Sequence, residues 1–512
     1  MGALAACGRM SARLAALLAV PVLVLSGCLA PEAVTPASVV DPASGAALSA
    51  IVASTGSGRL VPLPAEIGDV EVRVELLDFD GGEPTIGVTS DGTIFVTGPG
   101  TMAARSKDGG HEWDIVGDGS PTRARFNLDP FLFVDPLTDR VFNAPLYVAC
   151  THLSWSDDLG ETWENNALAG CGLPAHDHQK IAAGPPTDGT TTDGYPNVVY
   201  YAYNGGFRSI SIDSRVPTPK HGLEGTMVSR SLDGGKTWSL GVEAIPEDCH
   251  GGVNAPPHVA ASGIVYLGSA ECDGINVAIS RDSGLTWKVA ELGNDVGVNP
   301  YIAVNPNVAT DAAGNAYVVW PGEDALMYMS VSRDEGATWS SSIRVSPPSV
   351  TSTAFSVLAS GAEGRVSVAY VATDADTSGW ATPQAQDAAE DTRWHLMLST
   401  TLDGLADDPV FTTVRVTPED DPVQVGCIWL SGGTEECRNL LDFMGLVQHE
   451  GRAYLVFTDG CPEGCKDGPE ATEFPVVSTV LGKFRPSRTS VAIVERGPSL
   501  ADPASRIEPL PT

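Results

Sequence analysis

Basic residues are scarce in this chain. Its 512 residues include 30 Lys and Arg against 64 Asp and Glu, which gives a formal net charge of −34. This balance argues against nucleic acid and against an anionic membrane surface as partners, because both repel an acidic protein. The composition instead suits a soluble surface in a salty exterior, or a cation-binding role.

A membrane-spanning run is also missing at the N-terminus. Residues 14–25 are apolar and follow Arg9 and Arg13, but they fall short of the roughly 20 residues that cross a bilayer. The run ends in Leu25-Ser26-Gly27-Cys28, which resembles a prokaryotic lipobox. That resemblance implies a lipoprotein signal peptide over residues 1–27 and a lipid on Cys28. We therefore expect an extracytoplasmic protein that contacts the cell membrane through its lipid anchor only.

Composition divides the remaining chain into three parts. Residues 28–65 begin with the lipidated cysteine and are rich in Ala, Pro and Ser, which predicts a flexible tether. Residues 66–500 are expected to form the folded domain, and residues 501–512 a C-terminal tail. We expect a monomer.

Cysteine spacing gives no zinc motif. Eight of the ten cysteines remain after Cys7 and Cys28 are set aside, and they fall in neighbouring pairs. In an exported chain such pairs are candidate disulfides. The predicted bridges are Cys150–Cys171, Cys249–Cys272, Cys427–Cys437 and Cys461–Cys465.

Helical stretches are absent, and one short motif repeats instead. It reads S-x-D-x-G-x-T-W, as in residues 231–238. The Asp carboxylate accepts backbone N–H groups within a turn, Gly adopts an angle that other residues resist, and Thr and Trp begin the next strand. A turn that repeats at near-regular spacing indicates a structural role in the fold rather than an active site. The structural turn residues are Asp108, Asp158, Asp233, Asp282 and Asp334. Asp403 lies in a degenerate copy of the motif.

Around each turn lies a unit of about 50 residues, the size of a propeller repeat. Each unit contains four short strands, with insertions in the third and sixth units. This pattern predicts an all-β fold, a β-propeller of four-stranded antiparallel blades. Seven blades are favoured; six are the alternative, if the first or last unit is a shared closing blade. The units open near Glu83, Asp129, His178, Pro257, Asn299, Ala354 and Asp442.

With these turns, residues 80–410 resemble the BNR, or Asp-box, superfamily typified by sialidases. Sialidases clamp a substrate carboxylate with three arginines, attack with a Tyr backed by a Glu, and use an Asp as acid and base. They also carry an Arg-Ile-Pro element before the first turn. Here the nearest match is Arg59-Leu60-Val61-Pro62, which has different residues and precedes the repeats. The resemblance therefore implies the fold, and no catalytic residue is transferred from it.

The expected blade geometry separates two faces. The Asp turns join third and fourth strands, so the loops between second and third strands and between blades lie on the opposite face. That face collects all four cysteine pairs and most long insertions. Long loops on a rigid scaffold usually carry binding residues.

At the centre of that face, the openings of the innermost strands form a polar, mostly acidic ring. Three interpretations are open: the residues cap strands and link blades, they bind a sugar or a peptide, or they hold Ca²⁺. No other cofactor and no other metal is expected; His176-Asp177-His178 lacks a third ligand. The candidate ligand-binding residues are Glu83, Asp129, His178, Gln179, Asn254, His258, Asn299, Tyr301 and Asp442.

Two functions follow. The first is a surface-anchored, sialidase-like propeller that binds glycan or protein ligands on the disulfide-bearing face. The alternative is an exo-glycosidase of exo-alpha-sialidase type with a divergent site, in which Glu83 and Asp129 could act as acid and base. The candidate catalytic residues are Glu83, Asp129, Tyr301, Glu323, Arg208 and Arg438.

Overall fold

The computed structural model describes most of the chain from residue 50 onward. The described residues are 37–38, 48, 50–64, 67, 69–98, 103–117, 129–147, 150–171, 176–204, 225–246, 254–271, 274–292, 295–299, 306–430, 436–461 and 487–499. The predicted signal peptide, Cys28 and the tail after residue 500 lie outside them, as do Arg208 and Tyr301. Within the described part, no helix is both long and apolar enough to cross a membrane.

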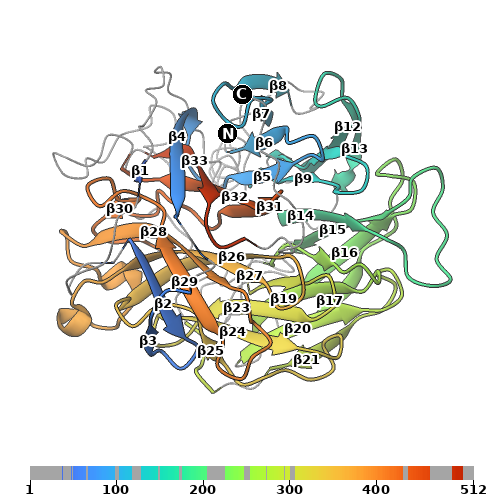
Figure 1. The fold of residues 1–512 in the computed structure, drawn as a ribbon. Helices are drawn as coiled ribbons and strands as arrows, with labels where there is room; N and C mark the ends of the chain where they lie inside the picture. Colours follow the sequence, from blue (N-terminus) through green and yellow to red (C-terminus); the bar gives the residue numbers. More distant parts are fainter. Residues whose placement is uncertain are drawn as a thin grey trace, which may run out of the picture.

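The strands form seven antiparallel sheets around a common centre, as Figure 1 shows. We number these blades one to seven and give their strands from the inside outward. Blade one contains β5 (Thr85–Val88), β6 (Ile94–Thr97), β7 (Ala103–Ser106) and β8 (Asp114–Gly117). Blade two contains β9 (Leu132–Val134), β10 (Val141–Asn143), β12 (Cys150–Ser156) and β13 (Glu164–Cys171), and β11 (Leu146–Tyr147) also pairs with β12. Blade three contains β14 (Asp177–Gly184), β15 (Val198–Asn204), β16 (Thr226–Ser231) and β17 (Val242–Ile245). Blade four contains β18 (His258–Val259), β19 (Val265–Glu271), β20 (Gly274–Ser280) and β21 (Lys288–Glu291).

The remaining blades include strands from both ends of the chain. Blade five contains β22 (Asn307–Thr310), β23 (Ala316–Pro321), β24 (Met327–Ser332) and β25 (Ile343–Arg344). Blade six contains β26 (Ser352–Ser360), β27 (Val366–Thr373), β28 (Arg393–Thr401) and β29 (Val410–Arg415), extended by β2 (Ile51–Thr55) and β3 (Leu60–Val61), with β30 (Gln424–Val425) beside β28. Blade seven contains β31 (Gly445–His449), β32 (Arg452–Asp459), β33 (Arg488–Arg496) and β4 (Glu71–Asp80), with β1 (Ala37–Ser38) at its edge. The described helices are two 3-10 turns in blade six, η2 (Thr377–Gly379) and η3 (Ala385–Asp387).

The innermost strands close a complete ring. Each contacts the next in the order β5, β9, β14, β18, β22, β26, β31 and back to β5. The all-β propeller prediction is confirmed, and the seven sheets correspond to the seven units counted in the sequence. Unit five differs at its opening, because its innermost strand starts at Asn307 rather than at Asn299.

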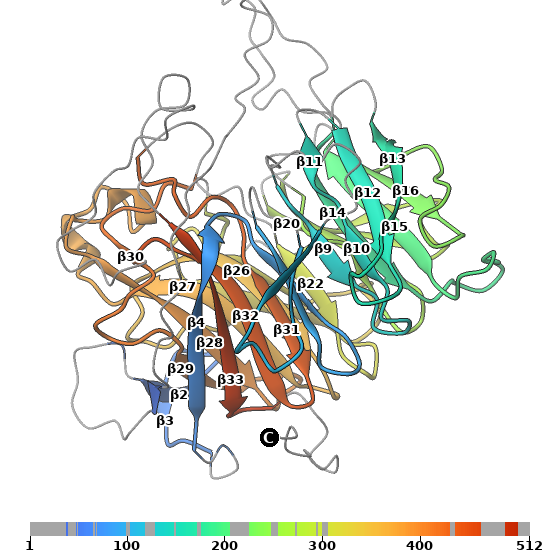
Figure 2. The ribbon, with the colours of Figure 1, turned by 90° about the horizontal axis from the view of Figure 1, so that it is seen from above.

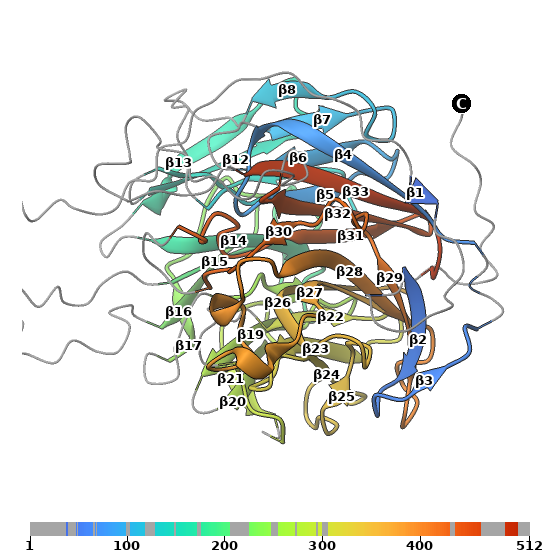
Figure 3. The same cartoon turned by 90° about the vertical axis from the view of Figure 1, so that its left-hand side faces the viewer.

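Blade seven is closed by the N-terminal strand. The pattern at residues 70–77 predicts a strand, and it forms β4, the outer strand of this blade, paired along β33. Figures 2 and 3 show these strands side by side, and also β2 beside β29. Residues 490–495 belong to β33, the third strand of this blade from the inside. Pairing with β4 covers the edge that β33 would otherwise expose.

Strand alternation builds the core between blades. On β15, Val199 and Tyr201 pack into a cluster with blade two, whereas Val198 and Tyr200 pack into a cluster with blade four. Every residue of this strand is buried. Successive side chains of a strand point to opposite faces, so a strand that is covered on both faces has a continuous apolar sequence.

The Asp turns have the predicted chemistry. Asp233 accepts hydrogen bonds from the Thr237 backbone N–H at 2.8 Å and from the hydroxyls of Ser231 and Thr237 at 2.8 and 2.6 Å. Ser231 Oγ in turn accepts the Gly235 N–H. Trp238 donates to the Gly235 carbonyl and is half-buried, and its indole packs against the core cluster between blades two and three, edge-on to Tyr201.

A further contact joins each Asp turn to the preceding blade. An arginine of that blade donates to a carbonyl of the turn, and in five of six cases the accepting residue follows the turn Asp and has a left-handed backbone, with φ between 55° and 76°. The donor–acceptor pairs are Arg73–Gly109, Arg105–Leu159, Arg140–Gly234, Arg230–Ser283, Arg281–Glu335 and Arg333–Leu405. The turns therefore link neighbouring blades, a role that the sequence did not reveal.

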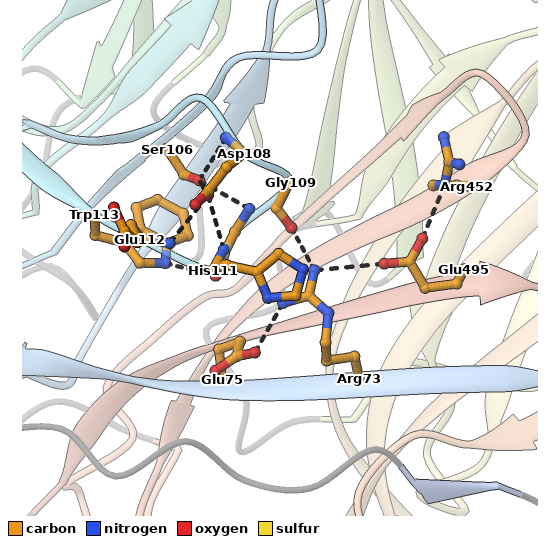
Figure 4. Close-up of polar contacts among 11 residues, drawn as sticks. Arg73, Glu75, Ser106, Asp108, Gly109, His111, Glu112, Trp113, Arg452 and Glu495 are labelled. Carbon is orange, nitrogen blue, oxygen red and sulfur yellow. Dashed lines mark hydrogen bonds and ion pairs between the residues drawn. The ribbon is translucent and has the colours of Figure 1, made fainter. Parts of the chain in front are cut away.

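Figure 4 shows this contact where the ring closes. Arg73 of β4 donates to the Gly109 carbonyl, to Glu75 at 2.8 Å and to Glu495 of β33 at 3.4 Å. Arg452 of β32 holds the other oxygen of Glu495 at 2.9 Å. The N-terminal strand is thus tied both to its own sheet and to blade one.

Replacing Arg73 by Gln should lower the free energy of unfolding by about 3 kcal/mol. The side chain is 10% exposed, and its loss leaves partly buried carboxylates and a carbonyl without their cation. Equilibrium urea unfolding measures the change. Arg496→Gln is the matched control on the same sheet: its side chain is 72% exposed, so the change should stay within about 0.5 kcal/mol. Equal losses in both variants would contradict the closing role of Arg73.

Candidate functional site

Several innermost strands open on a residue with an unusual backbone. Glu83, Asp129 and His178, at equivalent positions in blades one to three, have φ of 50°, 42° and 47°. Phe355 in blade six has φ 55°, and the register of β14 and of β26 shifts at this point. A left-handed, non-glycine residue costs of order 1–3 kcal/mol, and such residues cluster at functional sites. The same local distortion thus redirects the chain at the mouth of the channel in several blades.

Three carboxyl groups and one guanidinium meet at this mouth. Glu83, before β5, is 3% exposed and hydrogen-bonded to the Asp129 side chain from the next blade. Asp442, before β31, lies near Glu83 and is held by Arg438 at 3.0 and 3.1 Å. We call Glu83, Asp129, Asp442 and Arg438 the mouth cluster. Four of the predicted candidates are therefore brought together from blades one, two and seven.

The environment sets the protonation of this cluster. Burial raises the pKa of Glu83 well above its ordinary value, and the charges of Asp129 and Asp442 raise it further, against a smaller lowering by Arg438. Burial alone would lower the pKa of Arg438, but the charges of Asp442, Glu83 and Asp129 outweigh burial and raise it. Glu83 therefore keeps its proton and shares it with Asp129, as close carboxyl pairs do.

A cavity of about 240 Å³ lies between the innermost strands, next to Asp442 of the mouth cluster. All seven innermost strands or their flanks line it, mostly with apolar side chains, and Asp442 lies in its wall. Lys180 of β14 also lines the cavity and is 1% exposed. Its Nζ lies 3.8 Å from the ring centre of Phe443 and 5.1 Å from that of Phe131, in cation–π contact. The cavity thus combines apolar walls with charged groups of both signs.

Lys180 was not predicted as a site residue. It stands in Lys180-Ile181-Ala182-Ala183, an otherwise apolar innermost strand. A lysine within such a run is rarely fully buried unless it has a partner. The contrast between Lys180 and its apolar neighbours was the sequence signal that could have identified it as a site residue.

Other predicted ligand residues link blades instead. Gln179 is buried, and its amide donates to the carbonyls of Asp129 and Ala144 in blade two. His258 Nε2 contacts the Thr310 hydroxyl at 2.7 Å and accepts the Thr310 N–H at 3.0 Å, and burial lowers the pKa of His258 to about 4. The side chains of these two residues therefore match the first interpretation, in which the ring residues join neighbouring blades.

The remaining candidates lie apart from the cluster or are only partly described. Asn254 is buried and contacts the adjacent Ala255 carbonyl. Asn299 donates to Gln384, in the insertion of blade six, and Gln384 donates to the backbone of Glu323. The Glu323 side chain is exposed. His178 is half-buried at the position equivalent to Glu83.

Of the four predicted disulfides, Cys427–Cys437 is present, with Cα atoms 5.8 Å apart. Cys461 is also disulfide-bonded, and its predicted partner Cys465 lies outside the described residues. Cys150 and Cys171 are directly opposite on β12 and β13, whereas Cys249 and Cys272 are not described. Among the residues with described side chains, no group of three or more His, Cys, Asp or Glu could hold a metal ion, and the Ca²⁺ interpretation stays a prediction.

Residues 198–407 match the family model of the BNR repeat-like domain. This match confirms the predicted resemblance to the BNR, or Asp-box, superfamily, and the matched residues include the turns at Asp233, Asp282 and Asp334. No curated protein matches the chain.

Solved structures similar to this propeller have low sequence identity. A protein of unknown function from Dyadobacter fermentans is 14% identical with a TM-score of 0.41, over 81% of this chain and 95% of that one. A lectin from Aleuria aurantia, in complex with Fucalpha1-6GlcNAc, is 14% identical with a TM-score of 0.39, over 66% and 97%. The NanB sialidase from Streptococcus pneumoniae is 10% identical with a TM-score of 0.39, over 85% and 71%.

The contribution of Glu83 to the stability of the protein should fall as the pH rises above 4.5. In the unfolded chain this carboxyl releases its proton near its ordinary pKa of 4.5, whereas the folded chain keeps the proton to higher pH. Above pH 4.5 the folded state therefore binds more protons, and each further pH unit favours unfolding by up to about 1.4 kcal/mol. Glu83→Gln should remove this component, as measured by urea unfolding between pH 5 and 8.

Glu291→Gln, on the exposed outer strand β21, is the control and should follow the wild-type pH dependence. If Glu83→Gln also follows the wild-type curve, Glu83 is ionised in the folded protein and the assignment of its proton is wrong.

Proposed function

We propose that this chain is a binding propeller, and that its glycan or protein ligand enters the mouth of the central channel on the face opposite the Asp turns. The supporting observation is the mouth cluster at the end of a cavity. Its carboxyl groups come from three different blades, and two of them stand on left-handed residues. A rigid ring of blades fixes these groups before any ligand arrives, which lowers the entropic cost of binding.

The cluster gives less support to the exo-sialidase alternative. A sialidase needs several guanidinium groups around a substrate carboxylate, whereas three carboxyl groups surround Arg438 here. The hydrogen-bonded side chains of Glu83 and Asp129 also lie closer than the about 5 Å that separates the carboxyl groups of retaining glycosidases. This pair therefore leaves no room for a sugar carbon or a water between its two groups.

Binding should depend on the mouth cluster. A glycan array and a peptide array, probed with the purified full-length protein, identify ligands. Glu83→Gln and Asp129→Asn should each weaken binding at least tenfold, about 1.4 kcal/mol, because each changes the charge and hydrogen bonding of the mouth cluster. Glu291→Gln should bind as the wild type does. A panel of fluorogenic sialosides should show no turnover; hydrolysis that Asp129→Asn abolishes would instead establish the glycosidase alternative.

We further propose that the protein is anchored by a lipid on Cys28. The lipobox-like residues 25–28 and the tether-like composition that follows support this. In the native cell, Cys28→Ser should move the protein from the membrane fraction to the soluble extracytoplasmic fraction, because a propeller without its lipid has no other predicted membrane contact. Fractionation and immunoblotting measure the shift. Retention of the variant in membranes would overturn lipid anchoring at this residue.

A further inference from the structure

We propose that the channel cavity takes one uncharged sugar ring, whose hydroxyl groups are bound by Asp442, Lys180 and the neighbouring mouth cluster. The inference rests on the proposed function and narrows it to a substrate class. Neutral polyhydroxyl compounds fit both the size of the cavity and the balance of its charges.

The size of the cavity selects a compact ligand. An engineered protein cavity of about 150 Å³ accommodates benzene, and drug-sized ligands occupy pockets of about 300 Å³ or more. The channel cavity, at about 240 Å³, lies between them. A single hexose-sized ring fits this range, whereas a folded peptide segment does not. A longer glycan would have to extend out of the mouth, past the cluster.

The charges at the upper end of the cavity balance one another. Asp129 and Asp442 are acidic, Arg438 and Lys180 are basic, and Glu83 carries a proton because of its burial and its acidic neighbours. Asp442 and Lys180 both line the cavity itself. An uncharged ligand preserves this balance. The carboxylate of an acidic sugar would instead add a second negative charge to a cavity that already contains Asp442, and burying an uncompensated charge there is costly.

The chemistry of the groups also suits hydroxyls. Carboxylates accept from sugar O–H groups, and ammonium and guanidinium groups donate to sugar oxygens, each bond strengthened by the charge. Below them the walls are apolar, formed by Ile86, Val308 and Val357 among others, against which the C–H faces of a sugar can pack. A site built to bond hydroxyls discriminates strongly against analogues that lack them.

Calorimetric titration with monosaccharides tests the inference. The probes are the methyl glycosides of glucose, galactose, mannose and fucose, and that of N-acetylneuraminic acid, with the full-length protein. At least one neutral glycoside should bind, and the acidic glycoside should bind at least tenfold more weakly. Ser356→Phe places a ring in the cavity wall without changing any charge and should abolish binding. Ser341→Phe, on the exposed surface, is the matched control and should leave binding intact.

Lys180→Met keeps the length of the side chain and removes the ammonium. It should weaken neutral-sugar binding at least tenfold, with the folded state verified by its thermal transition. Unchanged affinity in Lys180→Met or in Ser356→Phe would overturn the inference.

The remaining outcomes separate the inference from the proposed function. A sialoside or a peptide whose binding is weakened by Asp129→Asn would support the mouth as a binding site and overturn the neutral-sugar class. Absence of any ligand on either array and in the titrations would overturn both.

Discussion

The contact between an arginine of one blade and an Asp-turn carbonyl of the next governs this propeller. The turn Asp collects N–H and hydroxyl donors, and this chemistry holds the following residue in a left-handed conformation. The carbonyl so presented accepts a guanidinium that would be costly to bury without an acceptor. A local turn thereby sets the position of one blade relative to its neighbour. The mouth cluster depends on that regularity, because its carboxyl groups come from separate blades.

Repetition made most of the fold predictable. Each Asp turn is a local pattern, and its position fixes a third and a fourth strand, so the turns identify blades one to six. Blade seven was harder, because its outer strand comes from residues 71–80 and its third from residues 488–496. A strand pattern indicates that residues 70–77 are extended, but it does not show which strand they pair with. The contacts of the inter-blade arginines could not be predicted for the same reason, because Arg73 and Gly109 are distant in sequence.

The positions of the site residues could be predicted from the sequence better than their roles. Glu83, Asp129 and Asp442 open their units in the sequence, and ring closure brings them together. Gln179 and His258 occupy similar positions, but their side chains bond neighbouring blades. Gln179 lies at a register shift between β14 and β15, which residue type does not encode. Lys180 was missed because strand periodicity treats a buried position as apolar, whereas here two aromatic rings surround its ammonium.

Closure by β4 has a consequence for how the protein folds during synthesis. Residues 71–80 emerge early, yet their partner strand is completed only near residue 496. Until then β4 lacks its partner, and the incomplete ring presents open strand edges of the kind that invite aggregation. The entropy of closing so long a loop must be overcome before that pairing stabilises the chain. A chain released from a ribosome that stalls before β33 would therefore be unable to close the ring, even if its first six blades were correctly folded.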